Sequence, residues 1–532
     1  MLDPEYLLRI SEGAEDIAEM LHNKVIKRVV SRVMTRVAKG KDYLLTARDK
    51  WELESLQEAG LLAEDLIKEI AAATKKQQQE IREAFEDAGV RTIRYDNAIY
   101  QAAGISTQPL EQSPQLVRVL ERGYKATMGE WENFTRTYAN AGQRAYLKAV
   151  DKAYVLTQSG TVSYSEAVKE AIEEIAAAGG VKVDYPSGRS DTIETATLRA
   201  VRTGIAQTCA EVTQRRMDEV GWDIVLTSAH LGARTGDGMD NHTNHFWWQG
   251  RFFSRSGNDP RFPPFRVCGL GDVQGISGAN CRHSFGPGDG EHNPYQDFDS
   301  DENQKAYEMT QRARELERRI RNTKREVMGL RAALDAPSAD PKALTDVQKA
   351  YDRKAAVLQR QNKEYNEFCD TNNFKKRDDR ITVAQWDRHQ ASMARVAAKR
   401  GEKAELERKR QIMYNKQKAR ETIGTEELPL NVHKGRQNKH IKGTREYQIG
   451  KSYLTISSEA AQEIVNRYAN TGKLKFTKSG DWSKKEVVYV DYPVGYAVDS
   501  SDRTEQLTSK VTIHYSKKGT HIVPAFDKRK EK

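Results

Sequence analysis

Apolar residues recur every three or four positions through most of the first 220 residues, which predicts long amphipathic helices. The spacing is clear at Leu53, Leu56, Leu61, Leu62 and Leu66. Pro109, within the stretch ISTQPLEQS, marks a break between two groups of helices. We therefore expect residues 1–220 to form a mainly α-helical body. This periodicity indicates core packing and says nothing about chemistry.

The pattern changes between residues 221 and 300, where glycine, aromatic residues, histidine and two cysteines are crowded together. The segments SAHLGARTGDGMDNHTNHFWWQGRFFS and FPPFRVCGLGDVQGISGANCRHSFGPGDG are rich in turn-forming residues and lack a helical period. We expect a small, irregular, Gly/Cys/His-rich unit that contains β-structure and is built around turns.

Residues 301–420 return to a helical period with a high density of charge. A first stripe follows the a/d steps of a coiled coil, at Ala313, Leu316, Ile320, Thr323, Val327, Leu330 and Leu334. Pro337 and Pro341 interrupt it, and a second stripe follows at Leu344, Val347, Tyr351, Leu358 and Tyr365. This predicts an antiparallel helical hairpin with arms of roughly 50 Å, which we expect to be a solvent-exposed structural arm. A basic helix over about 383–420 follows it.

The last fifth of the chain has a different character. Residues 421–429, which include GTEELPL, suit a short linker. The runs EVVYVDYPVGYAV and KVTIHYSKKGTHIVP then alternate apolar and polar residues, as β-strands do, and SEAAQEIVNRYA predicts one helix. Residues 430–532 are therefore expected to form a compact α+β domain.

Charge is distributed unevenly along the 532 residues. The chain has a formal net charge of +10, and the segment from Leu430 to Lys532 accounts for nine of these charges, with 20 Lys and Arg against 11 Asp and Glu. A basic unit at the end of a balanced body is typical of a phosphate-rich partner, although solvation alone also explains it.

Several classes of protein are disfavoured. No apolar run approaches the roughly 18 residues that span a membrane, so no membrane partner is expected. The N-terminal segment MLDPEYLLRISEGAED lacks the pattern of a secretory signal, and four cysteines are too few for a disulfide scaffold. We expect synthesis in a reducing cytoplasm.

Residues of the types that bind zinc gather in the 225–295 region, at His230, His242, His245, Cys268, Cys281 and His283. A structural zinc held by Cys268, Cys281, His283 and His230 is one interpretation. The spacings match no regular zinc motif, so the alternative is a turn-rich fold with buried cysteines and with histidines bonded to backbone carbonyls.

HLGAR (230–234), HFWWQG (245–250) and NCRHSFGP (280–287), taken as an ordered set, resemble the signature of minor head proteins of tailed phages, the minor capsid protein 2 and Mu-F-like head morphogenesis group. The resemblance covers residues 1–300 and the helices that follow. It implies a virion component in the capsid interior near the portal, which contacts portal and other capsid proteins and passes through the host cytoplasm during assembly. Fold-level analogy of this kind does not imply an enzymatic activity.

A second resemblance covers the C-terminal unit. NVHKGRQNKHIKGT (431–444), GKSYLTISSEAAQEIVNRYANTGKL and IHYSKKGTHIVPA (513–525) are similar to bacterial polymorphic toxin type 50. The resemblance implies a barnase/EndoU/colicin/RelE-like ribonuclease fold, an RNA substrate and a cognate immunity protein. Phage head domains fused to such toxins are known as MuF polymorphic toxins.

The residues of this unit suit metal-independent RNA cleavage. That reaction needs a base for the ribose 2′-hydroxyl, an acid for the leaving 5′-oxygen and cations for the phosphate. Histidine serves both proton roles near neutral pH, and this unit holds four of the eleven histidines. The predicted catalytic residues are His440, His514, His521, Lys439 and Lys517. The predicted phosphate or base contacts are His433, Lys434, Ser516, Thr520 and Tyr515.

Carboxylates do not accompany these histidines in the manner of a two-metal nuclease. Asp499, Asp502 and Glu505 lie in a polar loop without evident pairing, so no cofactor is expected for the ribonuclease. Two alternatives remain. The basic unit is a structural module that binds nucleic acid or another head protein without catalysis, or the head region is itself an enzyme, such as an NAD-using transferase, although no glycine-rich nucleotide loop supports this.

Overall fold

The computed structural model describes the chain except residues 178–180, 186–187, 337–339, 478–479, 500–502 and 528–532. The chain divides into two compact units, Met1–Gly401 and Glu402–Lys532. The first is mainly helical and the second is small and rich in strands, as expected from the sequence.

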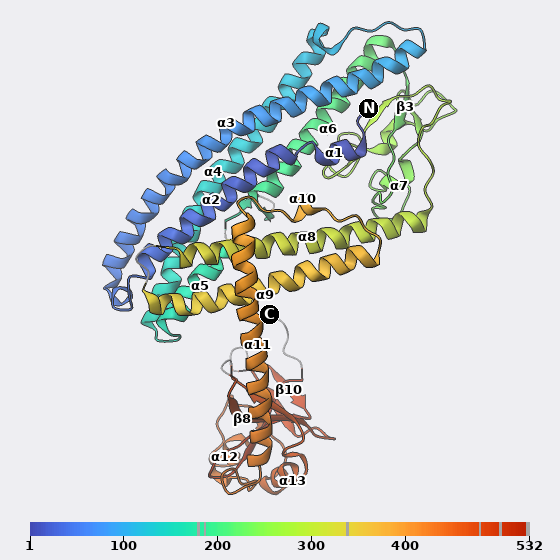
Figure 1. Cartoon of the computed structure of the whole chain (residues 1–532). Helices are drawn as coiled ribbons and strands as arrows, with labels where there is room; N and C mark the ends of the chain where they lie inside the picture. Colours follow the sequence, from blue (N-terminus) through green and yellow to red (C-terminus); the bar gives the residue numbers. More distant parts are fainter. Residues whose placement is uncertain (178–180, 186–187, 337–339, 478–479, 500–502, 528–532) are drawn as a thin grey trace. The chain divides into compact units, whose positions relative to one another are not determined.

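Long helices build the first unit (Figure 1). They are α1 (Pro4–Arg9), α2 (Glu12–Val37), α3 (Arg48–Ala102), α4 (Pro114–Gln158), α5 (Tyr164–Ala176), α6 (Ile193–Val220), α8 (Ser300–Leu334), α9 (Pro341–Thr371), the short α10 (Asp378–Ile381) and the start of α11 (Arg388–Thr422). Pro109 lies in the break between α3 and α4, as expected. Local sequence sets several helix starts: Ser163 accepts the Glu166 N–H ahead of α5, and Pro341 occupies the first turn of α9.

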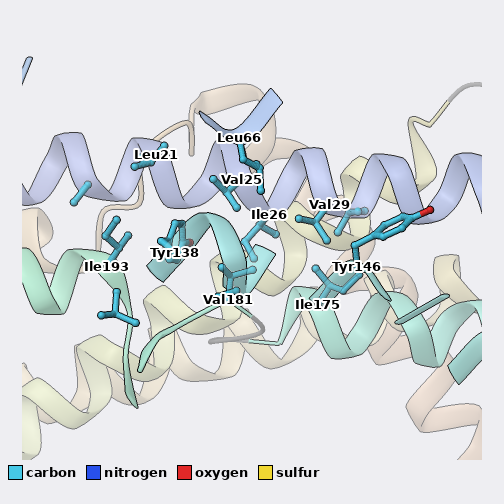
Figure 2. Close-up of a cluster of buried hydrophobic side chains, with 14 of the residues drawn as sticks. Leu21, Val25, Ile26, Val29, Leu66, Tyr138, Tyr146, Ile175, Val181 and Ile193 are labelled. Atoms are coloured by element: carbon cyan, nitrogen blue, oxygen red, sulfur yellow. The ribbon is translucent and has the colours of Figure 1, made fainter. Parts of the chain in front are cut away.

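The core of this unit lies where α2, α3, α4, α5 and α6 meet (Figure 2). Val25 and Val29 of α2, Leu66 of α3 and Tyr138 of α4 are fully buried there. Gly142 of α4 faces Leu66, and a Cβ at this position would lie 2.7 Å from a Leu66 methyl carbon, so glycine permits the close approach of the two helices. Burial of this apolar surface, at roughly 25 cal/mol per Å², is the main stabilising contribution.

The two coiled-coil stripes are α8 and α9, which pair side by side. The expectation of a solvent-exposed arm is wrong, because both helices also pack on the body. Val327 of α8 and Val347 of α9 are fully buried in the same core as α2. Arg325 of α8 is buried as well, 2.7 Å from Glu194 of α6 and paired with Glu19 of α2. The predicted interruption at Pro337 lies outside the described residues.

Residues 221–299 form a small subdomain with its own core. Its three-stranded antiparallel sheet has the order β4 (Phe252–Ser254), β3 (Ile224–Thr227), β5 (Phe285–Pro287). The short helix α7 (His245–Trp248) precedes β4, and turns occupy most of the rest. Trp248, Phe253, Phe265 and Phe285 fill the core.

The second unit contains two antiparallel sheets. One has the order β12 (His521–Pro524), β11 (Lys510–His514), β8 (Trp482–Tyr489), β7 (Lys473–Phe476). The other has the order β10 (Glu505–Thr508), β9 (Gly495–Val498), β6 (Tyr453–Leu454). Helix α13 (Ser458–Tyr468), capped by Ser457 and predicted from SEAAQEIVNRYA, packs on the first sheet together with the end of α11.

Residues 421–429 differ from the expected free linker. Ile423 and Leu428 are buried in the core of the second unit, and the Gly424 N–H donates to the Leu428 carbonyl. Gly424 has φ of +90°, which glycine adopts without strain and which allows the chain to fold back here. The segment is therefore a built turn of the second unit.

Candidate functional site

A row of basic side chains crosses one face of the four-stranded sheet in the second unit. His514 of β11 lies directly opposite His521 of β12 and Lys485 of β8, and Lys485 lies opposite Lys475 of β7. Residues that are directly opposite in an antiparallel pair point to the same face of the sheet. We call Lys475, Lys485, His514 and His521 the basic row.

His440 joins this row from a different part of the chain. It ends a short 3-10 helix, Asn438–His440, and its ring lies 5.9 Å from that of His521, with 15° between the ring planes. The rings of His514 and His521 are 4.7 Å apart. We call His440, His514 and His521 the histidine cluster. The hairpin of β11 and β12 thus contributes two of the imidazoles, and a segment that is distant in sequence contributes the third.

Hydrogen bonds pin the His440 segment to the edge of β12. Gln437 of α12 (Lys434–Gln437) is fully buried, and its side-chain amide donates to the Ile522 carbonyl at 3.0 Å and accepts from the Ile522 N–H at 2.8 Å. Two residues before Ile522, just ahead of β12, the Thr520 carbonyl accepts the His433 N–H at 2.8 Å. Because these bonds fix α12 against β12, they also fix the distance between His440 and His521.

The ring nitrogens of the cluster are not equivalent. His440 Nδ1 lies 2.8 Å from the Ser452 carbonyl oxygen, so Nδ1 carries the proton and Nε2 keeps a lone pair for accepting one. His521 Nδ1 is buried without a hydrogen-bond partner among the described residues. Unpaired buried polar atoms are uncommon, and they occur more often where a ligand completes the bonding.

Burial and neighbouring positive charge keep the cluster neutral. Burial, with help from His521 and Lys485, lowers the pKa of His514 to about 3. Burial, with help from His440 and Arg436, lowers the pKa of His521 to about 4. Burial also lowers the pKa of His440. At neutral pH all three rings are therefore proton acceptors, and a bound anion would raise their proton affinity by offsetting the positive charge around them.

The structure places the two predicted catalytic lysines, Lys439 and Lys517, in different surroundings. Lys439 is exposed next to His440 in the 3-10 helix. Lys517 is not brought to the histidine cluster: it lines a depression with Lys418 of α11 and with Trp482 and Lys484 of β8. The turn after β11, at Ser516–Gly519, separates it from the basic row.

Of the predicted phosphate contacts, Ser516 has the most suitable neighbour. Its hydroxyl accepts from Arg436 Nη1 at 2.7 Å and donates to the Gly519 carbonyl. Lys434 is exposed at the start of α12. His433, the residue before α12, has a buried Nδ1 without a partner among the described residues.

Tyr515 and Thr520 are occupied by the fold and are not brought into the cluster. The Tyr515 hydroxyl donates to Glu486, and its ring packs near Trp482 in the core. Thr520 is fully buried, and its hydroxyl donates to the Leu430 carbonyl at 3.2 Å. Strand alternation explains Tyr515, since residue 515 faces the side opposite His514.

Sequence reasoning did not assign Lys475, Lys485 or Arg436 to the site. Each of these cations approaches the cluster through strand pairing or through α12, and only the register of β7, β8 and β11 reveals the first two. The alternating run EVVYVDYPVGYAV begins one residue after Lys485 and does not identify the partner strand.

Two of the three acidic residues Asp499, Asp502 and Glu505 are described by the structure. Glu505 accepts a hydrogen bond from the Tyr453 hydroxyl within the second sheet. The Asp499 carbonyl and N–H close a backbone turn with Arg503 and Thr504, and Asp502 lies outside the described residues.

The predicted metal ligands of the first unit are partly brought together. Cys281 and His283 are adjacent and buried, and they meet His245, which the predicted ligand set left out. Cys268 is buried in the apolar core beside Phe265, and the His230 ring stacks on the face of the His283 ring at 4.4 Å. Neither belongs to the three-residue group.

Family models match both units. The model for phage minor capsid protein 2 matches residues 2–370, more than half of the chain. The chain belongs to the phage minor capsid protein 2 family. The model for bacterial toxin 50 matches residues 432–524, the part that carries the histidine cluster. Comparison with curated proteins found no match, and comparison with solved structures found none either.

Membership of this family associates the chain with the virion and with other phage head proteins, and the second match makes it a minor capsid protein fused to a C-terminal toxin domain. In the part of the chain that the structure describes, no helix has the length and hydropathy needed to cross a membrane.

Proposed function

We propose that residues 432–524 of this minor capsid protein are a ribonuclease that works without a metal ion. The observation that carries the proposal is the histidine cluster itself. Two imidazoles of the β11–β12 hairpin and a third from the 3-10 helix at Asn438–His440 lie at ring-to-ring distances of 4.7 and 5.9 Å, beside cations, in the region that matches a toxin model. A merely structural basic surface has no need to bury and stack its histidines.

The cluster supplies each group that the reaction requires. His440, whose Nε2 is available, accepts the proton of the ribose 2′-hydroxyl as the 2′-oxygen attacks phosphorus. His514 and His521 share a proton that passes to the 5′-oxygen as the phosphorus–oxygen bond breaks. The products are a 2′,3′-cyclic phosphate and a 5′-hydroxyl, and the charge balances because one proton is taken and one is returned.

Cations around the cluster serve the phosphate. Lys485 lies opposite His514 on β8, and Arg436 reaches the Ser516 hydroxyl near the start of β12. Positive groups that are already in place stabilise charge that develops on phosphorus, with little reorganisation. The approaching phosphate also raises the pKa of His514 and His521, so that one of them can hold the proton to be donated.

The donor set supports a mechanism without the paired metal ions of two-metal nucleases. Imidazoles and ammonium groups line the site, and Glu486 points to the opposite face, where it binds Arg420 and Tyr515. Two-metal nucleases instead need several converging carboxylates. The ribonuclease-type fold, the position in the capsid interior near the portal and a cognate immunity protein belong to the same proposal.

The test uses full-length protein made by cell-free synthesis. End-labelled RNA and DNA of one sequence are incubated with it in excess EDTA, and the ends of the products are determined. We expect RNA cleavage with 2′,3′-cyclic phosphate ends and no DNA cleavage. A variant of the exposed His389 of α11 is the control, because it loses a histidine that lies outside the cluster.

Nucleic-acid binding without cleavage would overturn the proposal and favour the non-catalytic, structural alternative. Cleavage that EDTA abolishes and added divalent metal restores would overturn its metal independence.

A further inference from the structure

A second cluster of three side chains, in the first unit, has the geometry of a metal site. His245 begins α7, and Cys281 and His283 precede β5, 36 and 38 residues later. The two Nδ1 atoms are 3.2 Å apart, and Cys281 Sγ lies 3.6 Å from His245 Nδ1 and 3.7 Å from His283 Nδ1. All three side chains are buried.

These separations match the edges of a zinc tetrahedron. Zinc binds imidazole nitrogen at about 2.0–2.1 Å and thiolate sulfur at about 2.3 Å, so tetrahedral edges are about 3.4 Å between nitrogens and about 3.6 Å between sulfur and nitrogen. The observed distances agree within about 0.2 Å, the tolerance expected of a real site. A single ion at the centre of the three atoms would contact each at its normal distance.

The hydrogen bonds on the far side of His283 point its lone pair at this centre. Its Nε2 lies 3.0 Å from Gln249 Oε1, which also accepts the His230 N–H at 3.0 Å. That second bond identifies the Gln249 atom as oxygen, so His283 Nε2 carries the proton and Nδ1 does not. Metal-binding histidines are oriented by this kind of outer hydrogen bond.

His245 can adopt the same arrangement. Its Nε2 lies 2.7 Å from the Gln274 carbonyl oxygen, and Arg234 lies against both groups, 2.6 Å from that oxygen and 2.7 Å from Nε2. With Nε2–H donated to the carbonyl, two Nδ1 lone pairs face each other at 3.2 Å. They repel unless a cation lies between them.

The surroundings suit a closed, structural ion. Cys281 Sγ accepts the His283 backbone N–H at 3.3 Å, a bond that stabilises a thiolate. The Trp248 ring lies 4.4 Å from His245 and 4.9 Å from His283, which limits access of water. Mixed sulfur and imidazole ligands select zinc among the common divalent ions.

We propose that His245 Nδ1, Cys281 Sγ and His283 Nδ1 bind one Zn²⁺ ion. The described residues bring no fourth His, Cys, Asp or Glu ligand atom within 4.8 Å of all three, so water or a backbone oxygen completes the tetrahedron. The ion closes a 36-residue loop in a subdomain that has three short strands and little helix, and so stabilises the minor capsid region against unfolding.

The first measurement is the metal content of untagged full-length protein purified with a reductant and trace zinc. We expect about one zinc per chain, bound in a single class of site. Cys281→Ser and His245→Ala should lower the content at least tenfold. Cys268→Ser and His230→Ala are matched controls, buried or stacked next to the site, and should keep the ion.

Cobalt replacement tests the ligands in the unmutated chain, so the result does not depend on a variant that fails to fold. A thiolate-to-cobalt charge-transfer band that Cys281→Ser removes and Cys268→Ser keeps would support the site. EDTA should lower the melting temperature of the first unit, and equimolar zinc should restore it.

Zinc-free protein with an unchanged melting temperature in EDTA would overturn the proposal. It would leave a hydrogen bond between His245 and His283, with Arg234 donating to Nε2. A Cys281→Ser variant that still bound one zinc would overturn it equally. Neither outcome bears on the ribonuclease proposal, which concerns the other unit.

Discussion

The chain contains two clusters of three ligand-type side chains, and they differ in what surrounds them. In the first unit, Cys281 Sγ and the Nδ1 atoms of His245 and His283 face one another, and the Nε2 atoms of the two histidines lie against carbonyl oxygens. In the second unit, the His440 ring stacks on the His521 ring and the His514 ring is tilted against it, among lysines and an arginine. The same imidazole group suits a cation in one setting and an anion in the other. The neighbouring groups decide which of the two ions the cluster suits.

The largest effect is expected from His440→Asn and His514→Asn. Each should lower the RNA cleavage rate by about 10²–10⁴-fold, because each removes a proton-transfer group. Initial rates on labelled RNA in EDTA measure this. His389→Asn, at an exposed position in the first unit, should retain the parental rate, and retention by His440→Asn would disprove its role as base.

A smaller effect separates two lysines that the sequence treats alike. Lys485→Ala should lower cleavage about tenfold, since Lys485 lies opposite His514. Lys517→Ala should change it less than about twofold, since Lys517 lies in the depression beside Trp482. Each variant loses one positive charge. A comparison of their steady-state cleavage rates at one ionic strength therefore separates the effect of the lysine's position from the effect of its charge. Equal losses would show that the basic row is not the phosphate site.

Gln437→Leu tests whether α12 positions His440. Both backbone groups of Ile522 lose their partner, which should destabilise the second unit by about 1–3 kcal/mol. We also expect a lower kcat with a nearly unchanged KM, because the distance from His440 to His521 is no longer fixed. Gln417→Leu, on the exposed face of α11, is the control. A change in KM alone would argue against positioning.

The smallest effect concerns pH. The histidines have a lower pKa in the folded unit than the ordinary 6.5, so the unfolded chain binds more protons between pH 6.5 and about 4. Stability is therefore full above pH 6.5 and declines as the pH falls through this window. The melting temperature of the second unit should drop by several degrees between pH 7 and 5, and His514→Asn should reduce the drop. Equal slopes in both proteins would contradict the assignment.

Strand alternation and helical period predicted much of the fold. The hairpin of α8 and α9, the helix α13 and the position of His514 opposite the core all followed from local pattern. The burial of that hairpin against the body could not be predicted from local pattern. It depends on contacts between residues far apart in sequence, such as the pairing of Arg325 with Glu19 and Glu194.

The candidate sites divide in the same way. His440, His514 and His521 were predicted by residue type and by resemblance, and the structure brings them together. Lys517 is not brought to the cluster because β11 ends at His514 and Lys517 lies in the turn that follows. His245 was left out of the ligand set, and only the packing of α7 against the residues that precede β5 brings it to Cys281 and His283.

The amide of Gln437 has a consequence for association between chains. β12 is an outer strand of its sheet, and at Ile522 this one side chain occupies both the donor and the acceptor that an incoming strand would use. At this point the edge of the sheet is hydrogen-bonded to a side chain instead of to another strand. Addition of a strand from another chain at Ile522 is therefore blocked unless Gln437 moves.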